Sequence, residues 1–201
     1  MKIFELEGDI QLLTLIYDDE LTELIKRERG KRMRGLWGKV SLESKKGTVK
    51  KGTPLGDCPY FVAEILIVSE KLKGLIQSFT DDELEFLPVD IDGQPGYSYM
   101  NVLCMLDALD QKRSELKRFE EGGKIMYVIQ ARYHEEIVNG HHIFRLPNYH
   151  GIYISEDLKK YLEDNYVHGA TYRDTTQRVE NPFAEVFAKP KKKKPKRGRL
   201  H

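Results

Sequence analysis

The chain is poor in cysteine and contains no long apolar run. Its 201 residues include only two cysteines, Cys58 and Cys104. Their spacing matches no metal motif, and such a low content fits a reducing compartment better than a disulfide scaffold. No apolar run approaches the roughly 18 residues of a membrane-spanning helix, and acids interrupt the first apolar stretch, which argues against a signal peptide. We therefore expect a cytoplasmic protein without membrane association.

Motifs for metal binding and phosphate binding are also missing. His134, His141, His142 and His150 fall within 17 residues, but no pair has the i, i+4 spacing of a helical metal site and no cysteine is near them in sequence. On a strand, the adjacent His141 and His142 would point to opposite faces. The glycine-containing loop over residues 44–59 lacks the Gly-Lys-Ser/Thr ending of a phosphate loop. We expect no bound metal and no cofactor.

The sequence offers two weak candidates for catalysis. Cys104 with one of the histidines would form a nucleophilic pair, but Cys104 lies in an apolar run, where an inert buried thiol is the commoner outcome. Asp107 and Asp110 are three residues apart and would pair on a helix for acid–base work, although such acids are more often solvated or capping. No Gly-x-Ser-x-Gly elbow is present. We expect that the protein is not an enzyme.

Charge is distributed unevenly along the chain. The whole chain has a net charge of +1, but residues 189–201 carry eight Lys or Arg and no acid, which leaves −7 for residues 1–188. The composition of this tail predicts disorder, and it would bind any polyanion, including nucleic acid. The candidate polyanion-binding residues of the tail are Lys191, Lys192, Lys193, Lys194, Lys196 and Arg197. A second basic cluster at Arg27–Arg34 is either a solvated helix end or a phosphate contact.

The most informative feature is a repeat at a spacing of 86 residues. The segment Ile67–Lys73 (IVSEKLK) returns as Tyr153–Lys159 (YISEDLK). An aromatic residue follows each serine by 17 positions, Phe86 in one copy and Tyr172 in the other. Each copy predicts an apolar strand, a serine N-cap, a short helix with an apolar stripe, a turn and a returning strand.

The remaining patterns complete a prediction of the fold. A helix is expected over 20–28, capped by Asp18 or Asp19 and ended by Gly30. Residues 102–109 fit a strand or a helical face. Apolar alternation and apolar runs predict strands at 1–7, 10–17, 60–68, 84–91, 97–101, 125–133, 141–146 and 170–172. The predicted class is α+β, mainly antiparallel strands with short helices, containing two similar strand–helix–strand units.

The expected domain organisation follows from this pattern. Residues 1–188 form one domain, or two lobes at about 1–115 and 116–188 that each hold one copy of the repeat. Residues 189–201 form a disordered basic tail.

Four blocks together resemble a known family. They are Ile67–Leu72, Leu84–Val89, Asn101–Ser114, and Gly140–Pro147 leading into Ile154–Lys159. In this order and spacing they resemble the eleventh-numbered immunity protein family of bacterial polymorphic toxin systems, formerly a domain of unknown function. The resemblance covers roughly residues 35–175.

The resemblance implies a function by binding. Such a protein is cytoplasmic, is encoded beside a secreted toxin, and protects the producing bacterium by binding and blocking that toxin without catalysis. Five residues match the family motif and are candidate partner-binding residues, namely Asn101, Asp107, Asp110, Ser114 and Arg145. A structural role is the alternative, because Asn and Asp at strand ends usually satisfy backbone groups.

Two further hypotheses concern the partner and the function. A body with a net charge near −7 would attract a cationic toxin and speed its association. The main alternative function is a nucleic-acid-associated accessory protein that uses the basic tail. A third hypothesis is an enzyme whose site uses Cys104 or the histidines.

Overall fold

The computed structural model describes residues 2–12, 14–16, 18–45, 53–62, 64–118 and 125–179. The tail at 189–201, with its candidate polyanion-binding residues, lies outside the described residues. Within the described residues, no helix has the length and apolar character needed to cross a membrane.

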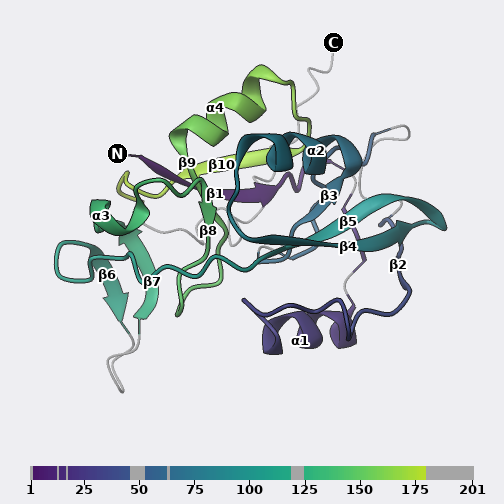
Figure 1. The fold of residues 1–201 in the computed structure, drawn as a ribbon, viewed down its shortest axis with the longest axis horizontal. Coiled ribbons are helices and arrows are strands. Elements are labelled where there is room, and N and C mark those ends of the chain that lie inside the picture. The colour runs from purple at the N-terminus through teal and green to yellow at the C-terminus, as the bar shows by residue number, and fades with distance from the viewer. Residues whose placement is uncertain are drawn as a thin grey trace, which may run out of the picture.

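The structure confirms the α+β class, with strands in three sheets and four helices among the described residues (Figure 1). All strand pairs are antiparallel except β2 with β4. In chain order the elements are β1 (Ile3–Gly8), α1 (Asp19–Arg27), β2 (Val40–Leu42), β3 (Ile67–Ser69), α2 (Glu70–Phe79), β4 (Leu84–Ile91), β5 (Gln94–Val102), β6 (Glu115–Arg118), β7 (Ile125–Gln130), α3 (Glu135–Val138), β8 (Ile143–Phe144), β9 (Tyr153–Ser155), α4 (Glu156–Asp164) and β10 (Ala170–Asp174).

The two predicted strand–helix–strand units are present and share one topology. The first unit is β3, α2 and β4, and the second is β9, α4 and β10. The sheet orders are β2-β4-β5-β3 and β10-β1-β9-β8, so in each unit another strand lies between the two strands. This inserted strand, β5 or β1, is antiparallel to both neighbours. Each unit is therefore a split β-α-β motif whose own strands run parallel.

Both helices start at the predicted serine caps. The Ser69 hydroxyl accepts a hydrogen bond from the Leu72 amide at 3.2 Å, and the Ser155 hydroxyl accepts one from the Leu158 amide at 3.1 Å. A cap of this kind contributes about 1 kcal/mol. The capped leucines are fully buried, so each cap directs the first apolar residue of its helix into the core.

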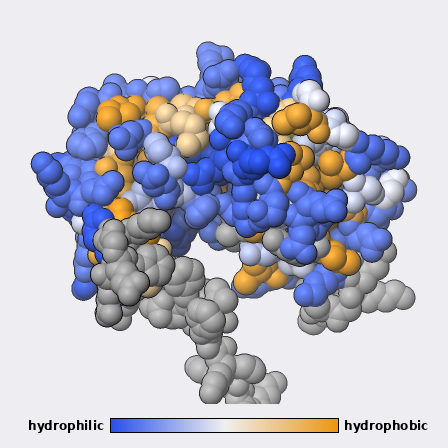
Figure 2. Space-filling model, turned by 90° about the horizontal axis from the view of Figure 1, so that it is seen from below, coloured by the Kyte–Doolittle hydropathy of each residue, from blue (hydrophilic) through white to orange (hydrophobic). Residues whose placement is uncertain are grey.

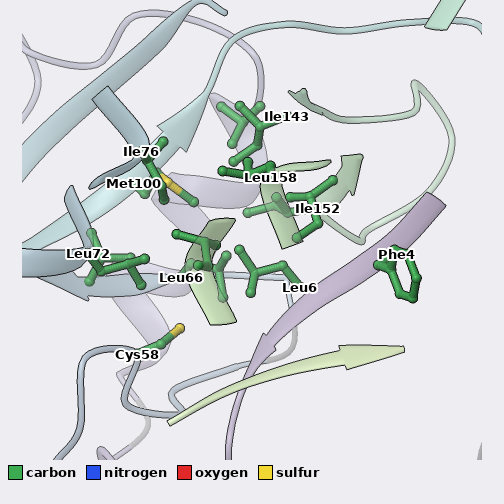
Figure 3. Packing of buried hydrophobic residues seen from close by; sticks show 14 residues of the cluster. Phe4, Leu6, Cys58, Leu66, Leu72, Ile76, Met100, Ile143, Ile152 and Leu158 are labelled. Carbon is green, nitrogen blue, oxygen red and sulfur yellow. The ribbon is translucent and has the colours of Figure 1, made fainter. Parts of the chain in front are cut away.

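The two units share one hydrophobic core. Helices α2 and α4 lie side by side on the same side of the two sheets (Figure 1), and the hydroxyls of Ser78 and Tyr161 meet between them at 3.2 Å. In the close-up of the core, Leu6, Leu66 and Leu158 converge (Figure 3). The cluster combines Leu66, Val68, Leu72, Ile76, Met100 and Val102 with Phe4, Leu6, Cys58, Ile143, Ile152, Ile154, Leu158 and Leu162.

The sheet of β2 to β5 also packs on its opposite face. Tyr99 and Met100 are consecutive residues of β5, so their side chains point to opposite faces. Met100 belongs to the shared core, whereas Tyr99 belongs to a second cluster with Leu21 and Ile25 of α1. Tyr99 also stacks on Trp37 with ring centroids 5.4 Å apart. This sheet therefore has α2 on one face and α1 on the other.

Helix α1 and strand β4 follow the prediction closely. The Asp18 side chain accepts a hydrogen bond from the Leu21 amide at 2.9 Å, and Gly30 beyond the helix has a φ of +74°. Strand β4 spans the predicted 84–91. Asp92 and Gly93 follow it with φ values of 52° and 76°, as a two-residue hairpin turn into β5 requires.

Several predicted strands were wrong in extent or in kind. Strand β1 pairs with β9 and β10. Among the described residues of 10–17, only Leu15 pairs with another segment, through an isolated bridge. The predicted strand 60–68 is reduced to β3, and 141–146 is reduced to β8. Residues 103–110 are neither helix nor strand, because Met105 and Leu109 only form single bridges to other segments.

Candidate functional site

Arg145 is the largest fully buried side chain in the described part of the protein. It follows β8 and is 1% exposed. Its Nη1 donates to the His150 carbonyl at 3.1 Å and its Nη2 donates to the Glu64 carbonyl at 3.0 Å. Burial lowers the pKa of the guanidinium from its ordinary value. Arg145 therefore fixes two irregular backbone segments from inside the protein.

A second arginine, Arg29, binds the backbone of residues 147–149, next to the His150 carbonyl that Arg145 binds. Arg29, just beyond α1, donates through Nη1 to the Tyr149 carbonyl and through Nη2 to the Pro147 carbonyl, each at 2.7 Å. The His150 ring nitrogen Nδ1 lies 2.5 Å from a Glu64 carboxylate oxygen. We call Arg29, Glu64, Arg145 and His150 the arginine cluster. A hollow of about 380 Å³ is lined by Arg29, Glu64 and His150 together with Lys26, Met105 and Pro147.

Asn101 acts on the backbone that follows α1. The side chain is fully buried, and its amide donates to the Lys31 carbonyl at 2.8 Å and to the Glu85 carboxylate at 3.1 Å. Glu85 is also buried and accepts from the amides of Met33 at 2.7 Å and Arg34 at 3.1 Å. Together Asn101 and Glu85 fix residues 31–34 on the sheet.

Asp110 and Ser114 hold a turn. The Asp110 carboxylate accepts from the amides of Lys112 and Arg113 at 3.0 and 3.1 Å and from the Arg113 side chain at 2.6 Å. The hydrogen bonds from Arg113 and Lys112 lower the pKa of Asp110. The Ser114 hydroxyl accepts from the Arg132 amide at 2.9 Å, and Asp107 is exposed. The structure thus places Asn101, Arg145 and the turn of Asp110 and Ser114 in three separate networks, and contact of the five candidate residues with a partner stays a prediction.

Most of the basic cluster at Arg27–Arg34 has partners within the fold. Arg27 and Lys31 lie 3.0 and 3.3 Å from Glu28, and Arg32 lies 2.5 Å from Glu83. Arg27 lies in the last turn of α1, whereas Arg29, Lys31 and Arg32 follow the helix, and phosphate contact by this cluster stays a hypothesis.

The structure brings Cys104 next to one of the histidines, His141, as the weak catalytic candidate required, and adds Asp82, which the sequence did not single out. Asp82 lies in the turn after α2, Cys104 follows β5, and His141 precedes β8. The Nδ1 atom of His141 is 2.8 Å from Asp82 Oδ1 and 3.5 Å from Cys104 Sγ. A hollow of about 530 Å³ opens beside them. Spacing along the chain gave no signal, because the three residues come from three separate segments.

Asp82 also anchors the backbone. Its Oδ2 accepts from the amides of His142 at 2.6 Å and Ile143 at 2.9 Å, and from the Thr80 hydroxyl at 2.7 Å. Burial raises the pKa of Asp82, but the hydrogen bonds from Thr80, His141 and these amides outweigh it and lower the pKa overall. The carboxylate is therefore ionised and ties the first unit to the start of β8.

The geometry of this cluster is unsuitable for a nucleophilic Cys–His–Asp relay. Such a relay needs the thiol at one imidazole nitrogen and the carboxylate at the other, whereas Cys104 and Asp82 both contact Nδ1 of His141. Burial, with the charges of Asp82 and Glu83, raises the pKa of Cys104 to about 11, which disfavours the thiolate. Cys104 is half-buried rather than fully buried.

Comparison with protein-family models identifies the class as an immunity protein. Residues 17–177 match the model described as an immunity protein family. This span includes both split units, the arginine cluster, and the cluster of Asp82, Cys104 and His141. The chain belongs to this family, Imm11, which confirms the resemblance seen in the sequence blocks. A comparison with curated proteins found no match.

Proposed function

We propose that this protein protects a bacterium by binding a cognate toxin, encoded nearby, and blocking it in a stoichiometric complex. The observation that carries the proposal is membership of the immunity protein family over residues 17–177. The geometry of Asp82, Cys104 and His141 is unsuitable for a nucleophilic relay, because both flanking groups contact the same imidazole nitrogen.

Asn101 and Arg145, which are buried, would then act indirectly, by holding the backbone of the toxin-binding surface in place. Asn101 holds residues 31–34, and Arg145 holds the loop that ends at His150. Fixing irregular backbone from inside keeps an interface in one shape, which lowers the entropy cost of binding. Asn101 and Arg145 are therefore positioning residues for the interface in this proposal.

Asp107 is the exposed residue of the five, and we propose that it contacts the toxin directly. It lies beside α3, because the neighbouring Ala108 carbonyl accepts from the His134 amide at 2.8 Å. Helix α3 begins with the exposed acids Glu135 and Glu136. The negative charge of Asp107, Glu135 and Glu136 would suit a cationic toxin, in line with the net charge of −7 over residues 1–188.

Charge reversal tests this placement. We expect Asp107→Lys to slow association with the toxin domain at least about fivefold at low salt, with the difference shrinking as salt screens the charges. Glu43→Lys is the matched control, because Glu43 is exposed and the substitution changes the net charge by the same amount. The measurement is the association rate at several salt concentrations. Equal slowing by both variants would contradict a contact at Asp107, and a rate independent of salt would contradict electrostatic attraction.

A further inference from the structure

We propose that Asp82, Cys104 and His141 form a binding site for a divalent transition-metal ion, with Zn²⁺ as the best match. One ligand atom from each residue, a carboxylate oxygen, the thiol sulfur and an imidazole nitrogen, lies within 4.8 Å of the other two. Carboxylate, thiolate and imidazole are all established zinc ligands. The turn after α2, the end of β5 and the start of β8 supply one ligand each. This inference is independent of toxin binding.

The spacing of the ligand atoms suits a tetrahedral ion. With Zn–N near 2.0 Å and Zn–S near 2.3 Å, the nitrogen and sulfur of a tetrahedral site lie about 3.5 Å apart. The distance from His141 Nδ1 to Cys104 Sγ is 3.5 Å. The distance from Nδ1 to Asp82 Oδ1 is 2.8 Å and would open to about 3.3 Å around the ion. That opening replaces one hydrogen bond and requires only small side-chain rotations.

The carboxylate is oriented in advance. Oxygen Oδ2 of Asp82 already accepts from the amides of His142 and Ile143. These bonds hold the side chain so that Oδ1 faces His141. Ligating carboxylates in metal sites are themselves hydrogen-bonded in this way, which fixes their orientation before the ion arrives.

An ion can enter the cluster, and a fourth ligand has room. The His141 side chain is 38% exposed, Cys104 is half-buried, and the adjoining hollow of about 530 Å³ is lined in part by Phe79, Gly140 and His142. Water would complete the tetrahedron from this hollow. Binding replaces the thiol proton of Cys104 by the ion, and that proton passes to the solvent.

The site would link the two units. Asp82 belongs to the first unit, between α2 and β4, and His141 leads into β8, which pairs with β9 of the second unit. Because the ligands are far apart in sequence, an ion that joins them stabilises the folded chain over the unfolded one. We expect Zn²⁺ at about a hundredfold excess over its Kd to raise Tm by about 5–10 °C.

Cobalt titration of the full-length protein tests the proposal. The chelator-treated protein is titrated with Co²⁺, and we expect saturation at one ion per chain with a thiolate-to-cobalt charge-transfer band that Zn²⁺ then abolishes. Cys104→Ser will lose the band, and Cys104→Ser and His141→Gln will each weaken binding at least about tenfold. Cys58→Ala is the matched control and will keep the band. Circular dichroism confirms that each variant is folded.

Two results would overturn the proposal. One is the absence of a charge-transfer band at saturating Co²⁺. The other is a folded Cys104→Ser or His141→Gln variant that binds Zn²⁺ as tightly as the parent protein, which would assign the ion to other surface groups.

Discussion

Replacing Arg145 with methionine will lower the free energy of unfolding by about 3 kcal/mol. Methionine fills similar space but donates no hydrogen bond. The carbonyls of Glu64 and His150, which accept from Arg145 at 3.0 and 3.1 Å, then lose this donor. Each unsatisfied buried acceptor costs about 1–3 kcal/mol. The two acceptors are backbone carbonyls, so the substitution removes the donor of each hydrogen bond and leaves its acceptor in place. Removal of one partner alone costs more than removal of both.

Arg29→Met is the matched control for this prediction. Arg29 also donates to two carbonyls, those of Pro147 and Tyr149, but its side chain is half-exposed, so water replaces the lost donors. We expect a loss below about 1 kcal/mol. Urea unfolding at constant m-value measures both changes. An Arg145→Met protein within about 0.5 kcal/mol of the parent, a typical surface effect, would contradict the role assigned to Arg145.

Leu72→Ala and Leu158→Ala will each destabilise the whole protein by about 2–5 kcal/mol. Both leucines are fully buried in the same cluster, one from each split unit. Because the core is shared, we expect a single cooperative thermal transition whose Tm falls in either variant. Leu36→Ala is the control, since Leu36 is 57% exposed and its truncation should change stability by less than about 0.5 kcal/mol.

Scanning calorimetry separates this prediction from the two-lobe alternative. One domain gives one transition with agreement between the calorimetric and van't Hoff enthalpies. Two lobes would give two transitions, with Leu72→Ala moving only one of them and Leu158→Ala only the other. That outcome would show that the shared cluster does not couple the units.

The sequence predicted the parts of the fold that local patterns determine. Ser69 and Ser155 marked helix starts, and the apolar stripes after them marked the buried faces. Local patterns could not predict that β1 pairs with β9 and β10, because these partners lie near the other end of the chain. In the structure a Cβ at Gly8 would lie 2.7 Å from Tyr60 Cα, so this glycine permits a close backbone approach.

The candidate site was predicted only in part, for a similar reason. Sequence blocks identified Asn101 and Arg145 and left open whether they were structural or contacted a partner; their burial and backbone bonds are visible only in three dimensions. The cluster of Asp82, Cys104 and His141 had no spacing signal, because its members are brought together by the pairing of distant segments. The face that carries α1 is mostly hydrophilic, with apolar side chains in separate patches (Figure 2), so hydropathy alone does not mark an interface there.

The central claim is neutralisation by stoichiometric binding, and titration of toxin activity tests it most directly. The purified full-length protein is added in increasing amounts to a fixed, high concentration of the toxin domain encoded beside it. We predict that toxin activity falls linearly and reaches zero at one equivalent, and that longer incubation does not change the endpoint. Complete inhibition by a small fraction of an equivalent that deepens with time would indicate turnover and contradict the account, as would full toxin activity in the presence of excess protein.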